Sequence, residues 1–342
     1  MASESRTLDV LDRHILHALQ VAPRAPFARI ATVLDVSEQT VARRFQRMRG
    51  AGVVRVLARP EPIQRAGASY WTLRIGCRPG AAGPLADALA RREDTSWISI
   101  GAGGAEITCQ AEVVSGQPTG LLHHLQRASS VLTFRAHQMM HRFPGRGEVD
   151  WVAPEHDLSP GQRDYLVEGA SVPATIRPVT HPTSEASLTA GDMPLLDELG
   201  RDGRASWATL ATATGWSQRQ VAHRVNELTA AGAIYFHLDV ANAAAGLHTV
   251  ANLWFTVAPA HLAAAGARLA DHPEVAFVAA MTGRTNVMAS ALFADAEGMY
   301  RYLTTKVAAI EGIQDVEIVP QLTRLKQSNS LMRDGRVGEP PR

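Results

Sequence analysis

The sequence predicts an α+β protein in which one two-part unit occurs twice along the chain. The first observation is an internal repeat: a shift of 180 positions aligns 14 identical residues among the 41 positions from 12 to 52. The second is that each copy starts with helical apolar stripes and continues with alternating, strand-like segments. The third is a stretch between the copies, residues 144–187, that holds six of the 19 prolines.

The first part of each copy is expected to contain three short helices. Apolar residues recur every three or four positions at 8–19, 27–34 and 41–48. A corner at Asp35 leads to Ser37, a favourable N-cap, and the third stripe stops at Gly52. Three helices with a tight corner before the last predict a helix-turn-helix, and residues 53–57 predict a short wing strand.

The second part of each copy is expected to be a sheet. Residues 70–77 alternate between apolar and polar side chains, as do their counterparts at 249–257. A helix (84–91; 261–270), two strands around a glycine turn, a second helix (120–128; 297–309) and a last strand (131–142; 313–325) follow. The order βαββαβ predicts a ferredoxin-like antiparallel sheet with helices on one face, whose other face must be covered.

These elements define the expected domains. Each copy pairs a winged helix-turn-helix with a ferredoxin-like domain, and the proline-rich stretch is expected to be mostly an extended linker with one short helix from Ser159 to Glu168. The predicted domains are a first helix-turn-helix at 7–60, a first ferredoxin-like domain at 68–143, a linker at 144–187, a second helix-turn-helix at 188–240, a second ferredoxin-like domain at 248–327 and a flexible tail at 328–342.

Composition narrows the protein class. Hydrophobic residues make up 46% and charged residues 20%, which excludes wholesale disorder, and the net charge of +1 leaves any electrostatic partner to a local patch. Two cysteines, Cys77 and Cys109, lie in apolar runs and are expected in the core. The N-terminus does not read as a secretory signal, and the uncharged stretch 240–267 is interpreted as a buried strand with flanking loops; we therefore expect a cytoplasmic protein without a membrane partner.

The third helix of each helix-turn-helix carries residue types that suit DNA. Arginine bridges guanine and glutamine bridges adenine in the major groove, and both side chains also hold phosphates. Residues 37–59 contain six arginines against Glu38, a balance of +5, whereas residues 217–239 balance to zero. A solvated helix face is the alternative for this charge run. The residues expected to contact double-stranded DNA are Ser37, Gln39, Thr40, Arg43, Arg44 and Arg47 in the first copy, and Ser217, Gln218, Arg219, Gln220, His223 and Arg224 in the second.

The two helix-turn-helix copies are expected to contribute unequally. Phosphate neutralisation supplies most non-specific affinity, so the first copy should add more binding and more salt dependence than the second. Unequal halves should also tolerate asymmetric half-sites, whereas a dimer of identical subunits favours a palindrome.

The segments LDRHILHAL, VSEQTVARRFQRMRGAGVV, HPEVAFVAAMTGRTNVMASALF and IEGIQDVEIVPQLTRLKQ, in the order helix-turn-helix then βαββαβ, resemble the Lrp/AsnC transcription factors. The resemblance covers both copies and omits the linker. It implies a transcriptional regulator of fused pseudo-dimeric build, whose ferredoxin-like sheets pair and bind a small-molecule effector, often an amino acid. A homo-oligomer of such chains is expected.

The resemblance places the effector at the glycine turn between the second and third strands of the sheet. The matching residues are Thr282, Gly283, Arg284, Thr285 and Asn286. A glycine turn brings backbone donors close to a carboxylate and Arg284 offers a charge, although a simple hairpin turn explains the glycine equally well. The first copy has alanines and glycines at 102–105 in the corresponding loop, which leaves that loop without the threonine and the arginine.

No cofactor, metal or catalytic residue is expected. His123, His124, His137 and His141 lack an accompanying cysteine or carboxylate cluster, so surface or stacking roles are favoured. No GxSxG or P-loop motif is present. The alternative is an enzyme that resembles the siroheme decarboxylases, which share this architecture, but residues 278–281 are apolar where that resemblance implies a His/Tyr/Arg cluster.

Overall fold

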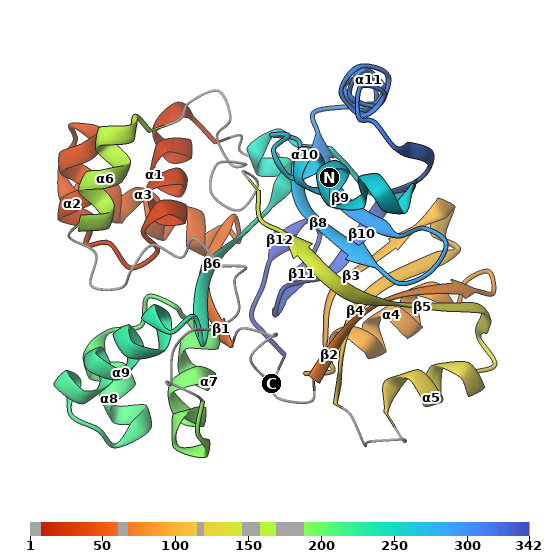
Figure 1. Cartoon of the computed structure of the whole chain (residues 1–342). Helices are drawn as coiled ribbons and strands as arrows, with labels where there is room; N and C mark the ends of the chain where they lie inside the picture. The colour runs from red at the N-terminus through yellow and green to blue at the C-terminus, as the bar shows by residue number, and fades with distance from the viewer. Residues whose placement is uncertain (1–7, 61–67, 115–119, 146–157, 169–187, 342) are drawn as a thin grey trace. The chain divides into compact units, whose positions relative to one another are not determined.

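The computed structural model describes residues 8–60, 68–114, 120–145, 158–168 and 188–341. The chain forms two compact units, and each is built from both halves of the sequence. Unit 1 (1–64 and 152–246) gathers the two helical parts, and unit 2 (65–151 and 247–342) gathers the two sheet parts (Figure 1). The predicted α+β class, with a helix-turn-helix and a ferredoxin-like domain duplicated in one chain, is confirmed.

Unit 1 contains two trihelical bundles with wings. Ser37 and Ser217 each cap a third helix by accepting a hydrogen bond from the backbone N–H of Thr40 and Gln220. The elements are α1 (Val10–Val21), α2 (Phe27–Leu34), α3 (Glu38–Gly50) and β1 (Val54–Pro60) in the first copy, and α7 (Met193–Arg201), α8 (Trp207–Thr214), α9 (Gln218–Ala230) and β6 (Ile234–Val240) in the second.

The two wings of unit 1 form one antiparallel ribbon. β1 pairs with β6 from Val54 opposite Val240 to Pro60 opposite Ile234. Ala58 of the first wing is buried in the hydrophobic core of the second helix-turn-helix, together with Leu195, Leu199 and Phe236. The second domain therefore completes its core with a strand of the first, which ties the two domains together.

The predicted short helix in the linker is confirmed as α6 (Pro160–Glu168), which packs on α1 and α2. Leu166 is buried in this contact, and the Gln162 amide donates to the carbonyl of Val33 at 2.8 Å. The Arg29 guanidinium lies over the Tyr165 ring and donates to the Tyr165 carbonyl. The extended connector predicted for the rest of 144–187 falls almost entirely outside the described residues.

Unit 2 contains two βαββαβ layers, as predicted. The structure lengthens the predicted last strands and divides the predicted helix at 297–309 into an α-helix and a π-helical turn. The first layer consists of β2 (Ala68–Cys77), α4 (Ala82–Ala90), β3 (Thr95–Gly101), β4 (Glu106–Val114), α5 (Leu121–Arg127) and β5 (Val131–Phe143). The second consists of β7 (Thr249–Val257), α10 (Leu262–Ala270), β8 (Val275–Met281), β9 (Val287–Phe293), α11 (Ala296–Tyr302), the turn Leu303–Val307 and β10 (Ile313–Gln327).

The last strand of each copy crosses into the sheet of the other copy. β5 pairs with β2 up to Gln138 and with β8 from Met139 onward. β10 pairs with β7 over its first half and with β3 over its second half. The pairing order β10-β3-β4-β2-β5-β8-β9-β7 therefore returns to β10. Each of these eight strands pairs with both of its neighbours in this order over part of its length.

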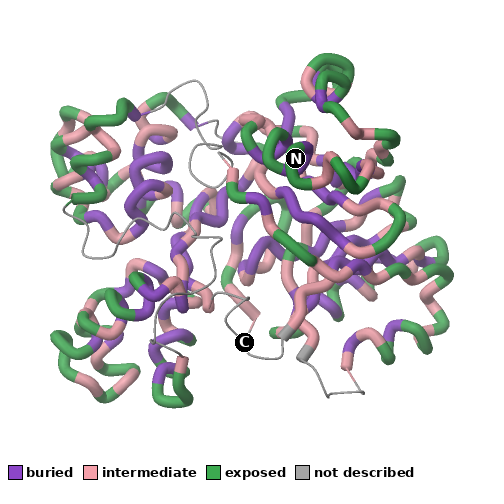
Figure 2. Tube along the Cα trace, in the orientation of Figure 1, coloured by how far each residue is buried: buried purple, intermediate pink, exposed green. Residues whose placement is uncertain are grey.

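The sheets of unit 2 have different inner faces. Leu73, Ile75 and Cys77 of β2 face the helices of their own layer, which leaves Thr72 and Arg74 on the opposite face, where both are buried. The corresponding face of the second layer carries a buried hydrophobic cluster of Trp254, Ala279, Met281, Met288 and Val319, beside the buried Asn252. Buried residues run along the strands (Figure 2), as expected for sheets covered on both faces. Cys77 and Cys109 are buried, as predicted.

The flexible tail predicted for 328–342 is wrong over most of its length. Strands β11 (Ser330–Arg333) and β12 (Arg336–Val337) form a hairpin that continues from β10. Ser330 and Val337 are buried, and Leu331 packs on the core of the first layer. The polar composition misled the prediction, because backbone pairing holds a short hairpin strand without an apolar run.

The uncharged stretch 240–267 contains β7 with a short 3-10 turn before it, in agreement with the buried-strand interpretation. Among the helices of the described residues, none combines the length and the hydrophobicity needed to cross a bilayer.

Candidate DNA-binding and effector sites

The third helix of the first copy, α3, buries one stripe and exposes the opposite one. Val41, Phe45 and Met48 are buried in the domain core. Gln39 and Arg43 lie on the exposed face, four residues apart, and make no hydrogen bond or ion pair with any residue that the structure describes. Glutamine and arginine in this position are free to meet base edges or phosphates.

Arg44 and Arg47, which the sequence predicts to contact DNA, are held by carboxylates of their own domain. Arg44 donates to Asp9 at 2.5 Å and to Asp12 at 3.0 Å, and Arg47 donates to Asp12 at 2.5 Å. Asp12 is buried at the start of α1. The guanidinium groups therefore join α3 to α1, and their contact with DNA stays a prediction.

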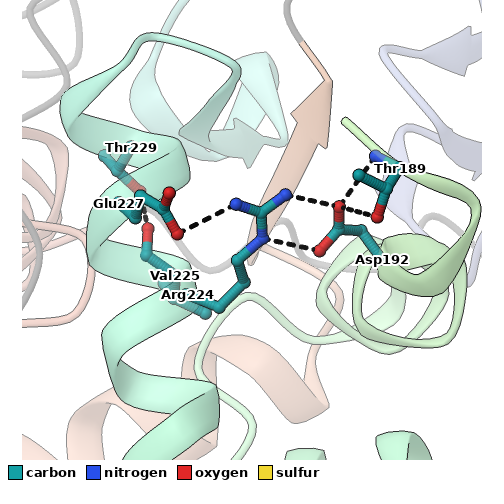
Figure 3. Close-up of polar contacts among 6 residues, drawn as sticks. All are labelled: Thr189, Asp192, Arg224, Val225, Glu227 and Thr229. Atoms are coloured by element: carbon teal, nitrogen blue, oxygen red, sulfur yellow. Dashed lines mark hydrogen bonds and ion pairs between the residues drawn. The ribbon is translucent and has the colours of Figure 1, made fainter. Parts of the chain in front are cut away.

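The same contact recurs in the second copy at the positions 180 residues further on. Arg224 of α9 donates from Nε and Nη2 to the two oxygens of Asp192, at 2.8 and 2.7 Å, and from Nη1 to Glu227 at 2.9 Å (Figure 3). The hydrogen bond from Arg224 lowers the pKa of Asp192 to about 2. Asp192 also accepts from the backbone and the hydroxyl of Thr189. Arg224 therefore joins α9 to the start of its own domain, and its contact with DNA stays a prediction.

The N-terminal residues of the two third helices are engaged in capping. The side-chain oxygen of Gln220 accepts hydrogen bonds from the N–H and the hydroxyl of Ser217, and the hydroxyls of Ser37 and Thr40 lie 2.8 Å apart. These four predicted DNA contacts therefore shape the helix N-termini. Gln218, Arg219 and His223 stay exposed on α9, without a hydrogen bond or ion pair to the part of the chain that the structure describes.

The exposed faces of α3 and α9 differ at equivalent positions. Gln39 corresponds to Arg219, and Arg43 corresponds to His223. Gln46 and Asn226, which sequence reasoning missed, continue these faces one turn further and are exposed. The helical spacing of 39, 43 and 46 is the signal that identifies them.

The basic patch predicted at 37–59 is weaker than its composition suggests. Three of its six arginines, Arg44, Arg47 and Arg49, form ion pairs with aspartates that lie outside this window; Arg49 pairs with Asp202 of the second helix-turn-helix at 2.9 Å. Arg43 is the arginine of α3 whose charge is least compensated.

The predicted effector turn joins β8 to β9, and two of its side chains are used to hold it. The Thr282 hydroxyl accepts from the backbone N–H of Gln138 at 2.8 Å. The Asn286 amide forms two hydrogen bonds of 2.8 Å with the backbone of Val257. Arg284 is exposed, Thr285 is half-buried, and Gly283 adopts φ +110°, so these three residues remain candidates for ligand contact.

A polar cluster around the buried Arg74 was missed by sequence reasoning. Arg74 donates two hydrogen bonds of 2.9 Å to Glu106 and two of 2.6 Å to Glu317, and its guanidinium lies 5.0 Å from the ring centroid of Trp254. The hydrogen bond from Arg74 lowers the pKa of Glu317. Arg74 and Trp254 occupy equivalent positions of the two copies, so the repeat alignment is the signal that pairs them.

His137 connects this cluster to the effector turn. Its ring lies 5.1 Å from that of Trp254, and its Nδ1 is 2.8 Å from the carbonyl oxygen of Thr282. Among the described residues, Nε2 of His137, Nε1 of Trp254 and the Thr72 hydroxyl are buried without a hydrogen-bond partner. His141 and the pair His123 and His124 make ring contacts, and no group of three His, Cys, Asp or Glu residues suited to a metal ion occurs in the described ranges.

Comparison with known families supports the two-part organisation. Residues 8–49 and 188–229 match the family model of the AsnC-type helix-turn-helix domain. Residues 250–331 match the model of the Lrp/AsnC ligand binding domain. The matched segments include α3, α9 and the turn between β8 and β9.

Two curated relatives come from Pyrococcus species. An uncharacterized HTH-type transcriptional regulator of Pyrococcus furiosus is 29% identical over 109 residues, which is 32% of this chain and 74% of the relative. A second one, from Pyrococcus horikoshii, is 28% identical over 141 residues, or 41% of this chain and 89% of the relative.

Among solved structures, the siroheme decarboxylase NirDL superposes with a TM-score of 0.59 over 94% of this chain and 93% of that chain. The sequence identity is 11%, so this likeness concerns the fold alone.

Proposed function

This chain belongs to the Lrp/AsnC family of transcriptional regulators, with its two parts duplicated, and we propose that it binds operator DNA through α3 and α9 under the control of a small-molecule effector. The observation that carries the proposal is the exposed face of each third helix, whose side chains named below make no hydrogen bond or ion pair with the described residues. The proposed DNA contacts are Gln39, Arg43 and Gln46 on α3 and Gln218, Arg219, His223 and Asn226 on α9.

The DNA-binding proposal is tested on duplexes selected from a random pool by the full-length protein. Replacing Arg43 with alanine removes a cation that no described residue neutralises. We expect the affinity for DNA to fall about tenfold, and the slope of log affinity against log salt concentration to decrease by about the contribution of one phosphate contact. Fluorescence anisotropy at several salt concentrations measures both quantities. Arg301→Ala is the matched control, because it removes one exposed arginine from unit 2.

Equal affinities of the Arg43→Ala and Arg301→Ala variants would contradict the proposal. Comparison with Arg219→Ala tests the expected inequality between the two domains: a larger loss of salt dependence for Arg43→Ala supports it, and equal losses refute it.

We further propose that the effector binds at the turn between β8 and β9 and is an amino acid or a related metabolite. Arg284 supplies a positive charge for a carboxylate, while Thr282 and Asn286 keep the turn in shape. Calorimetric titration of the twenty amino acids should identify a ligand whose affinity falls at least fivefold in Arg284→Ala and is unchanged in Arg268→Ala. Binding that both variants retain would place the effector elsewhere.

The full-length structural likeness to a siroheme decarboxylase makes an enzyme the second candidate. Residues 278–281 of β8 are all buried and apolar, so they offer no proton donor at the position that the resemblance implies. A change in the absorption spectrum of siroheme on titration with the protein would favour this alternative.

A further inference from the structure

Two arginines of unit 1 cross reciprocally between the helix-turn-helix domains. Arg24 donates to the carbonyl oxygens of Gly203 at 2.5 Å and of Ala205 at 2.8 Å, and its guanidinium lies 4.2 Å from the ring centroid of Trp207. In the opposite direction, Arg204 donates to the carbonyl oxygens of Pro23 at 2.6 Å and of Ala25 at 2.9 Å. Its guanidinium lies 4.5 Å from the ring centroid of Phe27.

The two sets of contacts are equivalent under the repeat. Each arginine, its two carbonyl acceptors and its aromatic ring lie 180 positions from their counterparts. We define Arg24, Arg204 and these partners as the arginine clasp. Because both guanidinium groups bind backbone oxygens, the clasp fixes the paths of the main chain itself.

The clasp acts at the segments that set the direction of each recognition helix. Its carbonyl acceptors lie in the loops between the first and second helices, and its rings, Phe27 and Trp207, are the first residues of α2 and α8. Burial lowers the pKa of each guanidinium to about 10, so both remain charged at neutral pH. If a guanidinium group left its acceptors, partly buried backbone oxygens would lose their hydrogen-bond partner. This cost favours a single arrangement of the two helix-turn-helix domains.

Other contacts in unit 1 also hold the two helix-turn-helix domains together. Arg49 at the end of α3 pairs with Asp202, which also accepts from the backbone N–H of Arg204. The ribbon of β1 and β6 joins the two wings. A Cβ at Gly203 would lie 2.9 Å from the backbone of Leu57, so the loop that carries the clasp lies directly against the first wing.

We propose that Arg24 and Arg204 are positioning residues that hold α3 and α9 at one separation, so that the protein selects operators by the spacing of their half-sites. This inference rests on the proposed DNA binding. Two rigidly joined DNA-binding domains bind more tightly when the spacing of the half-sites matches the separation of the domains. This additional affinity is lost when the spacing changes. One inserted base pair shifts a half-site by about 3.4 Å and rotates it by about 35°.

The first experiment measures the separation without DNA. Spin labels on Gln46→Cys and Asn226→Cys, both exposed, report the distance between α3 and α9 by pulsed electron paramagnetic resonance, while Cys77 and Cys109 are buried. We expect one narrow distance distribution in the parent protein. The double variant Arg24→Lys plus Arg204→Lys keeps both charges but loses the planar set of guanidinium N–H donors. We expect its distance distribution to be at least twice as wide as that of the parent protein.

An unchanged width in the lysine variant would overturn the inference. The lysine pair is preferred to alanine because it leaves a cation over each ring, and circular dichroism checks that it folds. Arg201→Ala, which removes an exposed arginine of α7 outside the clasp, is the matched control and should leave the width unchanged.

The second experiment measures spacing preference. A duplex selected by the parent protein is varied by insertion or deletion of one and two base pairs between its half-sites. We expect the parent protein to lose about tenfold or more in affinity on these changes, and the lysine variant to lose less than threefold.

The outcomes separate this inference from the proposed function. A uniform drop across all spacings in the lysine variant would mean that the clasp only stabilises the fold, and would overturn the positioning role. Failure of the parent protein to select any duplex would instead refute DNA binding, and the distance measurement would still decide whether the clasp fixes the two helices.

Discussion

At the residue scale, helical geometry alone does not predict which arginines of the third helices stay exposed and which bind carboxylates of their own domain. The apolar stripe correctly places Val41, Phe45 and Met48 in the core. It leaves Arg44 beside that stripe, and a side chain of this length reaches either DNA or the first helix. The identity of Asp12 with Asp192 and of Arg44 with Arg224 across the repeat is the sequence signal for the second choice.

The pairing of Asp192 with Arg224 predicts a dependence of stability on acid. The pKa of Asp192 is lowered from 3.8 to about 2, so the pairing contributes fully above about pH 4 and is lost as the pH falls toward 2. We expect Asp192→Asn to remove about 2 kcal/mol of stability at neutral pH and much less near pH 2. Denaturant unfolding followed by tryptophan fluorescence at several pH values measures this difference.

The control for that measurement is Asp197→Asn, an exposed aspartate of α7 without a hydrogen bond to the described residues; Asp192 is the N-cap of the same helix. It should shift stability by less than about 0.5 kcal/mol at every pH. A pH-independent effect of Asp192→Asn would argue against the ion pair as the source of the acid dependence.

At the scale of elements, alternation and apolar spacing predicted the helices and strands of the two repeated parts, but not how the strands pair. The crossing of β5 and β10 between the sheets depends on where each strand leaves its own neighbour, and the alternating pattern continues unchanged through that point. The residues of the cluster around Arg74 come from four strands of the two layers. Predicting this cluster would therefore have required the strand register as well. The hairpin of β11 and β12 was missed because its apolar residues, Leu331, Met332 and Val337, are flanked by polar ones and form no long apolar run.

The glycine turns of the two layers provide a prediction at this scale. Gly283→Ala places a Cβ 2.8 Å from Nδ1 of His137 at φ +110°, so we expect a loss of about 2 kcal/mol from backbone strain and displacement of the histidine. Gly103→Ala is the matched control at the equivalent position: its φ is +67° and no atom lies within 4 Å, so about 1 kcal/mol is expected. Thermal unfolding of both variants tests the difference, and equal losses would contradict it.

At the scale of the whole molecule, duplication let the sequence predict two copies of each part and the covering of one sheet by the other. The closed order of eight strands explains why neither copy needs a second chain to cover its sheet. The inner faces differ, because the first layer buries Arg74 where the second layer buries Trp254. Two identical layers would bring arginine onto arginine where Arg74 now meets Trp254.

The exposed residues of α3 and α9 have a consequence for gene organisation. Gln39 of α3 corresponds to Arg219 of α9, and Arg43 corresponds to His223. Under the proposed DNA binding, the two ends of the operator would therefore meet different side chains, and the bound chain would have a direction. A symmetric dimer reads the same in both directions along the double helix. This regulator would instead sit in one orientation and so present one defined flank to the promoter upstream and another to the gene downstream.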